Sequence, residues 1–154
     1  MNTLKINSLL SFNQAKPMKP FLFSLLIATL TSCSNPKKAT VAVNPLNGTW
    51  VTTKLIMGGN ELPPAAVQNQ KLIISDSNYT YIAESVDKGV VKYSGNKMDI
   101  YGKDGVNAGQ HFTAIYKMEN EILVICYNLA GNSYPESYET AGKPTFFTAH
   151  FKKE

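Results

Sequence analysis

From Leu46 to the end of the chain, apolar and polar residues alternate with period two, which is the pattern of half-buried β-strands. Clusters of glycine, asparagine, aspartate and serine interrupt this alternation and indicate turns, one of them at residues 87–89. The predicted strands span residues 48–57, 70–75, 79–86, 90–94, 97–101, 110–118, 121–128 and 145–152. Most connections are short, so neighbouring strands must be antiparallel, because a parallel crossover needs about a dozen residues.

Eight sequential antiparallel strands in a domain of this length predict an all-β fold, an eight-stranded up-and-down barrel. A two-sheet sandwich is the alternative architecture. No part of this region shows a helical stripe, and only residues 63–70 suit a short helical turn. Trp50, at the start of the first strand, is expected to be buried and to close one end of the barrel.

The chain before Leu46 has a different pattern. Residues 21–30 form an almost unbroken apolar run that follows several lysines. The run is shorter than the roughly 20 residues of a transmembrane helix, and it fits a secretory signal. We therefore predict a signal peptide at residues 1–32, a polar tether at 33–45 and a barrel domain at 46–154. Met18 is a second candidate start, because Lys19 and Pro20 directly precede the apolar run.

Residues 30–33, Leu-Thr-Ser-Cys, resemble the lipobox of bacterial lipoproteins. The resemblance implies that Cys33 is lipidated and becomes the mature N-terminus. Two or three acyl chains give lasting attachment to a membrane where a single chain is marginal. The implied location is the bacterial cell envelope, in the outer membrane if the source is Gram-negative. The alternative is a buried N-terminal helix that ends at an ordinary cysteine.

A second resemblance concerns the barrel itself. Gly48-Thr-Trp50 resembles the Gly-x-Trp signature of lipocalin-type barrels, in which these residues are structural. Residues 115–127 and the later Pro135-Glu-Ser-Tyr138 extend the likeness to a small lipocalin-like domain family of unknown function, first noted in planctomycete proteins. The likeness covers residues 46–152. It implies a barrel that is secreted or lipidated, without an established activity.

The charge distribution gives no support for a nucleic-acid partner. The net charge of the whole chain is +4, and all of its basic residues are lysines. From Cys33 onward, however, twelve lysines oppose eleven acidic residues, so the predicted mature protein is nearly neutral. A nucleic-acid-binding domain normally carries a basic patch.

Candidate chemistry is sparse, and we predict no enzyme, metal ion or cofactor. His111 and His150 lie in separate predicted strands, on the outer face, without a carboxylate or thiolate at metal-ligand spacing. Cys126 is flanked by apolar strand residues and is expected to be a buried, inert thiol. It has no disulfide partner if Cys33 carries lipid. Residues 99–109 do not match a calcium-binding loop.

Aromatic residues supply the remaining candidate site. Phe112 and Tyr116 share the inward face of one strand, and Phe147 and Phe151 share that of the last strand, while Tyr138 lies in the long preceding loop. We interpret these five residues as the lining of a pocket for a small apolar or amphipathic molecule. The same rings suit a filled barrel. In that case the domain is a protein-contact module of the envelope, such as an inhibitor or assembly factor, and the sequence leaves its oligomeric state open.

Overall fold

A computed structural model of the chain describes residues 43–154. The predictions for the signal peptide, for Cys33 and for most of the tether lie outside the described residues. Within residues 43–154, we find no helix with the length and apolar character needed to cross a membrane. Residues 43–154 belong to one compact unit, which includes every strand described below.

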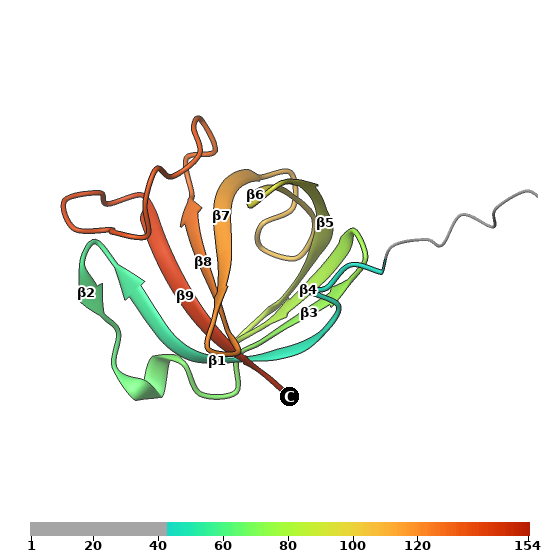
Figure 1. The fold of residues 1–154 in the computed structure, drawn as a ribbon, viewed down its shortest axis with the longest axis horizontal. Coiled ribbons are helices and arrows are strands. Elements are labelled where there is room, and N and C mark those ends of the chain that lie inside the picture. The colour runs from blue at the N-terminus through green and yellow to red at the C-terminus, as the bar shows by residue number, and fades with distance from the viewer. Residues whose placement is uncertain (1–42) are drawn as a thin grey trace, which may run out of the picture. The chain divides into compact units, whose positions relative to one another are not determined.

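The described residues form a closed antiparallel β-barrel (Figure 1). Its strands are β1 (Gly48–Met57), β2 (Asn60–Glu61), β3 (Lys71–Ser75), β4 (Asn78–Ile82), β5 (Val86–Ser94), β6 (Lys97–Asp104), β7 (His111–Glu119), β8 (Ile122–Asn128) and β9 (Phe146–Lys153). β1 pairs with both β3 and β9, so eight strands close the barrel, while the two-residue β2 pairs only with β1. A single 3-10 turn, η1 (Pro64–Ala66), is the only helical element in this part of the chain. The predicted eight-stranded barrel and its short helical turn are confirmed.

One predicted turn is wrong. Residues 87–89 lie inside β5, and the connection between β4 and β5 falls at residues 83–85 instead. Gly89 is required for close packing within the strand. A Cβ atom there would lie 2.1 Å from the carbonyl oxygen of Tyr101 and 2.6 Å from Cε1 of Tyr79. A glycine inside a strand often marks such a close approach rather than a turn.

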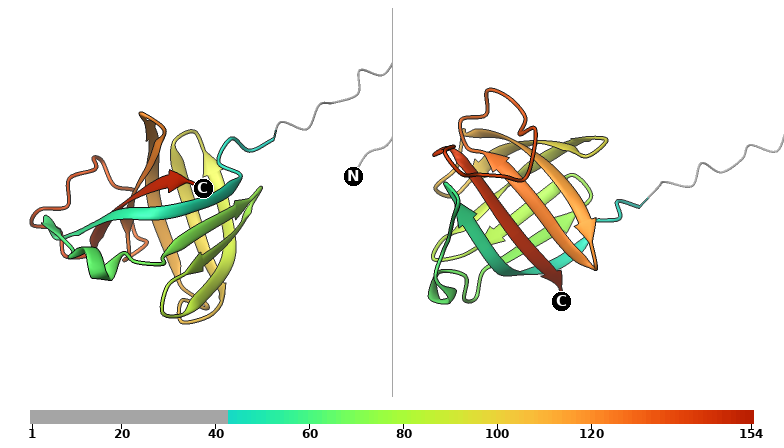
Figure 2. Two further views of the ribbon diagram at one scale, coloured as in Figure 1. Left: turned by 90° about the horizontal axis from the view of Figure 1, so that it is seen from below. Right: turned by 60° about the vertical axis from the view of Figure 1, so that its left-hand side comes forward.

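The two ends of the barrel differ in their connections. At one end, the closed end, two-residue turns at 76–77, 95–96 and 120–121 join consecutive strands. At the other end, which we call the mouth, the connections at 58–70, 83–85, 105–110 and 129–145 are longer (Figures 1 and 2).

The indole of Trp50 lies near the closed end and is only 2% exposed, as predicted. Its Nε1–H donates a hydrogen bond of 2.8 Å to the carbonyl oxygen of Leu46, which is itself buried. Gly48 has a φ of +134°, a backbone conformation that residues with a Cβ atom rarely adopt. A Cβ atom at this position would lie 2.8 Å from the side chain of Lys153. The Gly-x-Trp segment therefore has a structural role at this end.

The long connection between β8 and β9 covers the outer face of the barrel wall. Thr113 and Thr148 point outward from their strands and donate hydrogen bonds to the carbonyl oxygens of Ser133 (2.6 Å) and Tyr138 (3.2 Å). This cover buries the outward-facing Cys126 completely, and burial raises the pKa of its thiol. The predicted burial of Cys126 is confirmed, and it results from a second packed layer outside the barrel.

Candidate functional site

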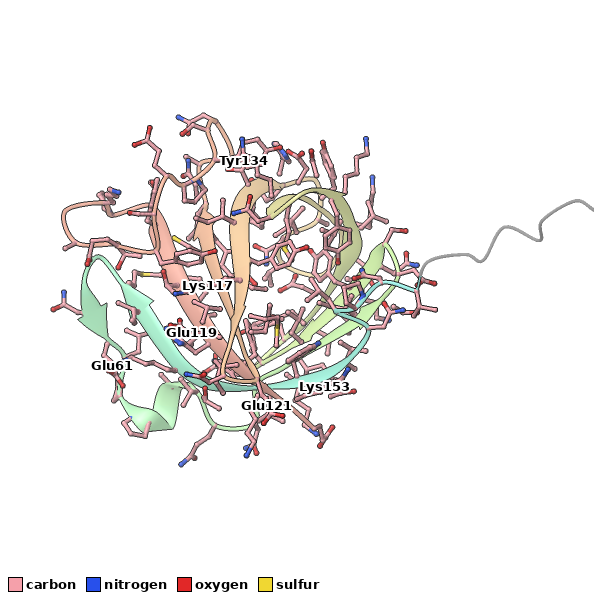
Figure 3. All side chains as sticks on the ribbon, in the orientation of Figure 1. Glu61, Lys117, Glu119, Glu121, Tyr134 and Lys153 are labelled. Carbon is pink, nitrogen blue, oxygen red and sulfur yellow. The ribbon has the colours of Figure 1, made fainter. Side chains whose placement is uncertain are left out.

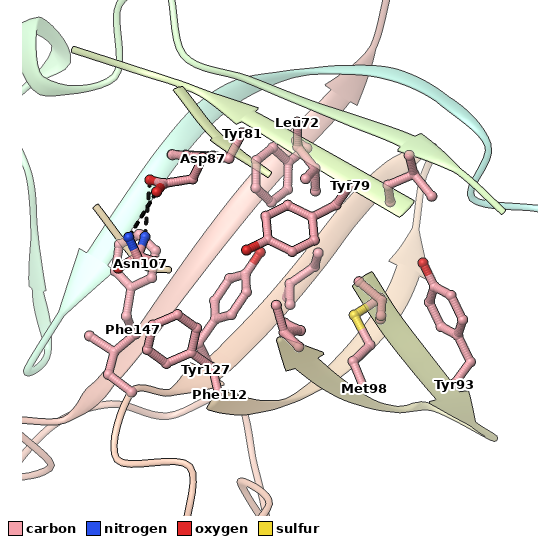
Figure 4. A pocket seen from close by; sticks show the side chains of 16 residues that line it. Leu72, Tyr79, Tyr81, Asp87, Tyr93, Met98, Asn107, Phe112, Tyr127 and Phe147 are labelled. Carbon is pink, nitrogen blue, oxygen red and sulfur yellow. Dashed lines mark hydrogen bonds between the residues drawn. The ribbon is translucent and has the colours of Figure 1, made fainter. Parts of the chain in front are cut away.

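The barrel interior contains a cavity of about 140 Å³ (Figure 4). Side chains from every strand between β3 and β9 line it, together with one residue from each of two mouth loops. Most of the wall is aromatic or aliphatic, and its aromatic members are Tyr79, Tyr81, Tyr93, Phe112, Tyr127, Phe147 and Phe151. Apolar cavities of about 150 Å³ hold one benzene-sized molecule.

Three of the five predicted pocket residues line this cavity: Phe112, Phe147 and Phe151. Tyr116 and Tyr138 do not. Tyr116 lies nearer the closed end, where its hydroxyl donates to the carbonyl oxygen of Gly95 (3.1 Å). Tyr138 lies on the outer wall with the Lys117 ammonium 4.8 Å from its ring centroid, because the loop that carries it folds over the outside of the barrel. The prediction is therefore wrong for these two residues, because neither contributes to the cavity wall.

Tyr79 and Tyr127 each direct a hydroxyl group into the cavity. Figure 4 shows their hydroxyl groups pointing toward each other inside the cavity. Burial raises the pKa of Tyr79 and raises that of Tyr127 well above its ordinary value. Both hydroxyls are therefore neutral at physiological pH, and each is able to donate and to accept a hydrogen bond. The sequence contained a signal for both tyrosines, because the alternation of inward and outward positions along β4 and β8 places each of them on the inward face of its strand.

One charged side chain lies in the cavity wall. Asp87 is only 5% exposed, and each of its carboxylate oxygens accepts one hydrogen bond from Asn107 (Figure 4). The backbone N–H of Asn107 lies 2.9 Å from Oδ1, and its side-chain Nδ2 lies 3.0 Å from Oδ2. After burial, the negative charge of Asp87 is the second cause of the raised pKa of Tyr79.

Glycines hold the mouth loop that carries Asn107 in its place. A Cβ atom on Gly102 would lie 1.8 Å from the carbonyl oxygen of Asn107. A Cβ atom on Gly105, whose φ is +91°, would lie 2.4 Å from Oδ1 of Asp87. The loop folds back against the barrel wall only because these two positions lack a side chain.

Several exposed apolar side chains surround the mouth. They come from the mouth ends of β1 and β5 and from two connecting loops: Met57 (40% exposed), Val86 (46%), Val106 (74%) and Leu129 (39%). Leu129 also lines the cavity, so the cavity extends to the inner side of this rim. We call these four residues the mouth rim.

A polar cluster on the outer wall involves one of the two histidines. Asp99 accepts a hydrogen bond from the hydroxyl of Tyr134, a residue of the loop between β8 and β9 (Figure 3), and lies 2.9 Å from Nε2 of His111. The Tyr134 hydrogen bond is the main cause that lowers the pKa of Asp99, and His111 adds to it. Sequence spacing left His111 without a carboxylate neighbour. The register of β6 and β7, in which Asp99 pairs with Thr113, brings the two together across the strands.

This cluster does not form a metal site. In residues 43–154, no group of three or more histidine, cysteine, aspartate or glutamate residues is placed to hold a metal ion. His150 points outward from β9, where burial is the main cause that lowers its pKa and Lys54 is the next.

The cavity and its mouth are thus the candidate site. Phe112, Phe147 and Phe151 supply apolar walls, while Asp87 supplies a charge near the entrance. The comparisons with models of protein families and with curated proteins found no match to this chain.

Proposed function

We propose that this protein is a membrane-anchored lipoprotein of the bacterial envelope, whose lipocalin-like barrel binds one small apolar or amphipathic molecule. The observation that carries this proposal is the cavity of about 140 Å³ between the aromatic rings of the barrel interior. The lipobox-like segment that ends at Cys33 supports the anchor, and the Gly-x-Trp segment supports the lipocalin-like assignment.

The size of the cavity limits the ligand to a single ring or a short chain. Pockets for drug-sized ligands usually measure about 300–1,000 Å³. Burying an aromatic ring removes about 150–250 Å² from water, and at about 25 cal/mol per Å² this contributes about 4–6 kcal/mol. That free energy corresponds to a Kd between about 1 mM and about 40 μM, before the entropic cost of binding is subtracted.

The described chain enters the barrel at its closed end. Asn47 lies at the closed end, where its side-chain amide donates to the carboxylate of Asp76 in the turn between β3 and β4 (2.8 Å). A tether that precedes Asn47 therefore joins the barrel at the end opposite the mouth rim.

Toluene titration followed by NMR tests the cavity directly, using the compact unit of residues 40–154. We expect toluene to shift the signals of cavity residues such as Phe112 and Ile125. Val91→Phe fills the cavity and should abolish these shifts. Val90→Phe is the matched control, because the neighbouring residue does not line the cavity, and it should retain them. Toluene that shifts no cavity signal in the unmodified protein would refute the proposal.

A second experiment addresses the natural ligand and the anchor. Native mass spectrometry of the protein purified from its own membranes should show a bound small molecule in addition to the acyl chains on Cys33. A mass that corresponds to the acylated chain alone would show that the protein leaves the membrane without a ligand.

The mouth rim favours protein contact as the second candidate function. Its four exposed apolar side chains are of the kind that gather at protein–protein interfaces. If toluene does not bind, and if Val106→Ser releases a protein that copurifies with the unmodified chain, this function replaces the first. Val43→Ser is the matched control, since Val43 is equally exposed but lies at the closed end.

A further inference from the structure

We infer that the cavity selects small apolar amines, with the protonated amino group of the ligand paired with Asp87. This inference rests on the proposed function, because it assumes that the cavity binds a small molecule. It adds the charge of the ligand and the direction in which the ligand lies.

The charge of the wall is the first argument. Asp87 is the only charged residue among those that line the cavity, and no lysine or histidine lies among them. None of the ion pairs in residues 43–154 includes Asp87. A buried carboxylate is unfavourable unless it is paired and hydrogen-bonded, so a cationic ligand would remove an energetic penalty that the free protein carries.

The remaining hydrogen-bonding capacity of Asp87 is the second argument. An ionised carboxylate offers about four acceptor sites. Asn107 occupies two of them, one on each oxygen. Two sites are therefore left for a ligand, and an ammonium group brings three donors. Asn107 also restricts the orientation of the carboxylate, so this acceptor is preorganised in the free protein.

The position of Asp87 sets the direction of the ligand. Asp87 lies near the mouth end of β5, directly opposite Tyr81 on β4. Met98 and Tyr93 line the cavity near the closed-end termini of their strands. The amino group therefore lies near the entrance, and the apolar part of the ligand lies deeper in the barrel. The aromatic rings of the wall favour a nearby cation further through their negative faces.

The same arrangement disfavours anionic ligands. A carboxylate or phosphate group would meet the negative charge of Asp87 without a cationic side chain in the wall to compensate. Inside the cavity, the repulsion between an anionic ligand and Asp87 outweighs the stabilisation that hydrogen bonds from Tyr79 and Tyr127 would provide. Fatty acids and phosphorylated molecules are thus poor candidates for this cavity.

Four probes that share one ring test the inference by NMR titration of residues 40–154: benzylamine, benzyl alcohol, toluene and benzoate. We expect benzylamine to bind at least about tenfold more tightly than benzyl alcohol or toluene, a ratio that corresponds to one charge-assisted hydrogen bond. Benzoate should not bind. Asp87→Asn should reduce benzylamine affinity to that of benzyl alcohol. Asp104→Asn, which removes the same charge from the exposed end of β6, should retain the preference.

The possible results separate the inference from the proposed function. If toluene binds but benzylamine binds no more tightly than benzyl alcohol, the inference is wrong and the proposed function stands. A tenfold preference that survives in Asp87→Asn also overturns the inference. If none of the probes binds, both fail. Should Asp87→Asn not fold, the side-chain amide signal of Asn107 in the unmodified protein decides: at saturation, benzylamine should shift it clearly further than benzyl alcohol or toluene does, and equal shifts would overturn the inference.

Discussion

Replacing Trp50 by alanine tests the structural role of the closed end. The indole is 2% exposed, so the substitution leaves a cavity among core residues. Truncating a buried tryptophan costs about 3–5 kcal/mol of unfolding free energy. The loss of the 2.8 Å hydrogen bond to the carbonyl oxygen of Leu46 contributes about 0.5–1.5 kcal/mol of that total. A domain of this size is usually stable by about 5–15 kcal/mol, so Trp50→Ala should remain folded but weakened.

Urea unfolding followed by far-ultraviolet circular dichroism measures this loss, because the variant has no tryptophan fluorescence. With a slope of about 2 kcal/mol per molar urea, the midpoint should fall by about 2 M. Trp50→Phe keeps most of the ring but removes the donor, and should cost about 1–2 kcal/mol. Met118→Ala is the control, since Met118 is 49% exposed and its loss should cost at most about 0.5 kcal/mol. A loss below about 1 kcal/mol for Trp50→Ala would refute the argument.

Three further predictions concern the anchor, the acid stability and the barrel wall. Cys33→Ala should move the protein from the membrane to the soluble fraction, whereas Cys126→Ala should stay membrane-bound; an unchanged distribution excludes lipidation at Cys33. Because the pKa of Asp99 is lower in the folded state than its ordinary value of 3.8, the charged carboxylate stabilises the fold above pH 3.8. This stabilisation is lost as the pH falls through the folded-state pKa, so Asp99→Asn should flatten the decline in unfolding free energy below pH 3.8. Gly89→Ala should lower the unfolding free energy by about 1–3 kcal/mol, measured against the exposed neighbour Lys88→Ala, because its Cβ would collide with Tyr101. Equal stability of these two variants would contradict the packing assigned to Gly89.

The strands were predictable because each is an independent signal in the sequence. Alternation and turn residues placed β1 at residues 48–57, where the structure also has it. The predicted turn at residues 87–89 was wrong because Asp87, Lys88 and Gly89 are of the types that are common in turns. Their true role depends on Tyr79 and Tyr101, which approach Gly89 from the two neighbouring strands. A local pattern does not contain that information.

The candidate site was only partly predictable for the same reason. Phe112, Phe147 and Phe151 were found through their inward alternation. Tyr116 has the same alternation but lies too far along β7 to reach the cavity, and alternation does not report depth. Asp87 has no sequence signal of its own, since its burial depends on a loop that returns from β6 with Asn107.

Several residues at the mouth depart from local sequence preferences, and these residues support a function there. Asp87 places a charge where an apolar residue would pack without penalty. Because Gly102 and Gly105 have no side chains, the loop packs closely enough for Asn107 to reach the Asp87 carboxylate. At the closed end, Trp50 and Leu46 pack together, and the indole N–H is satisfied by the carbonyl oxygen of Leu46. Natural sequences depart from local consistency mainly at functional sites. Selection for stability alone does not account for a buried, hydrogen-bonded carboxylate in the wall of an apolar cavity.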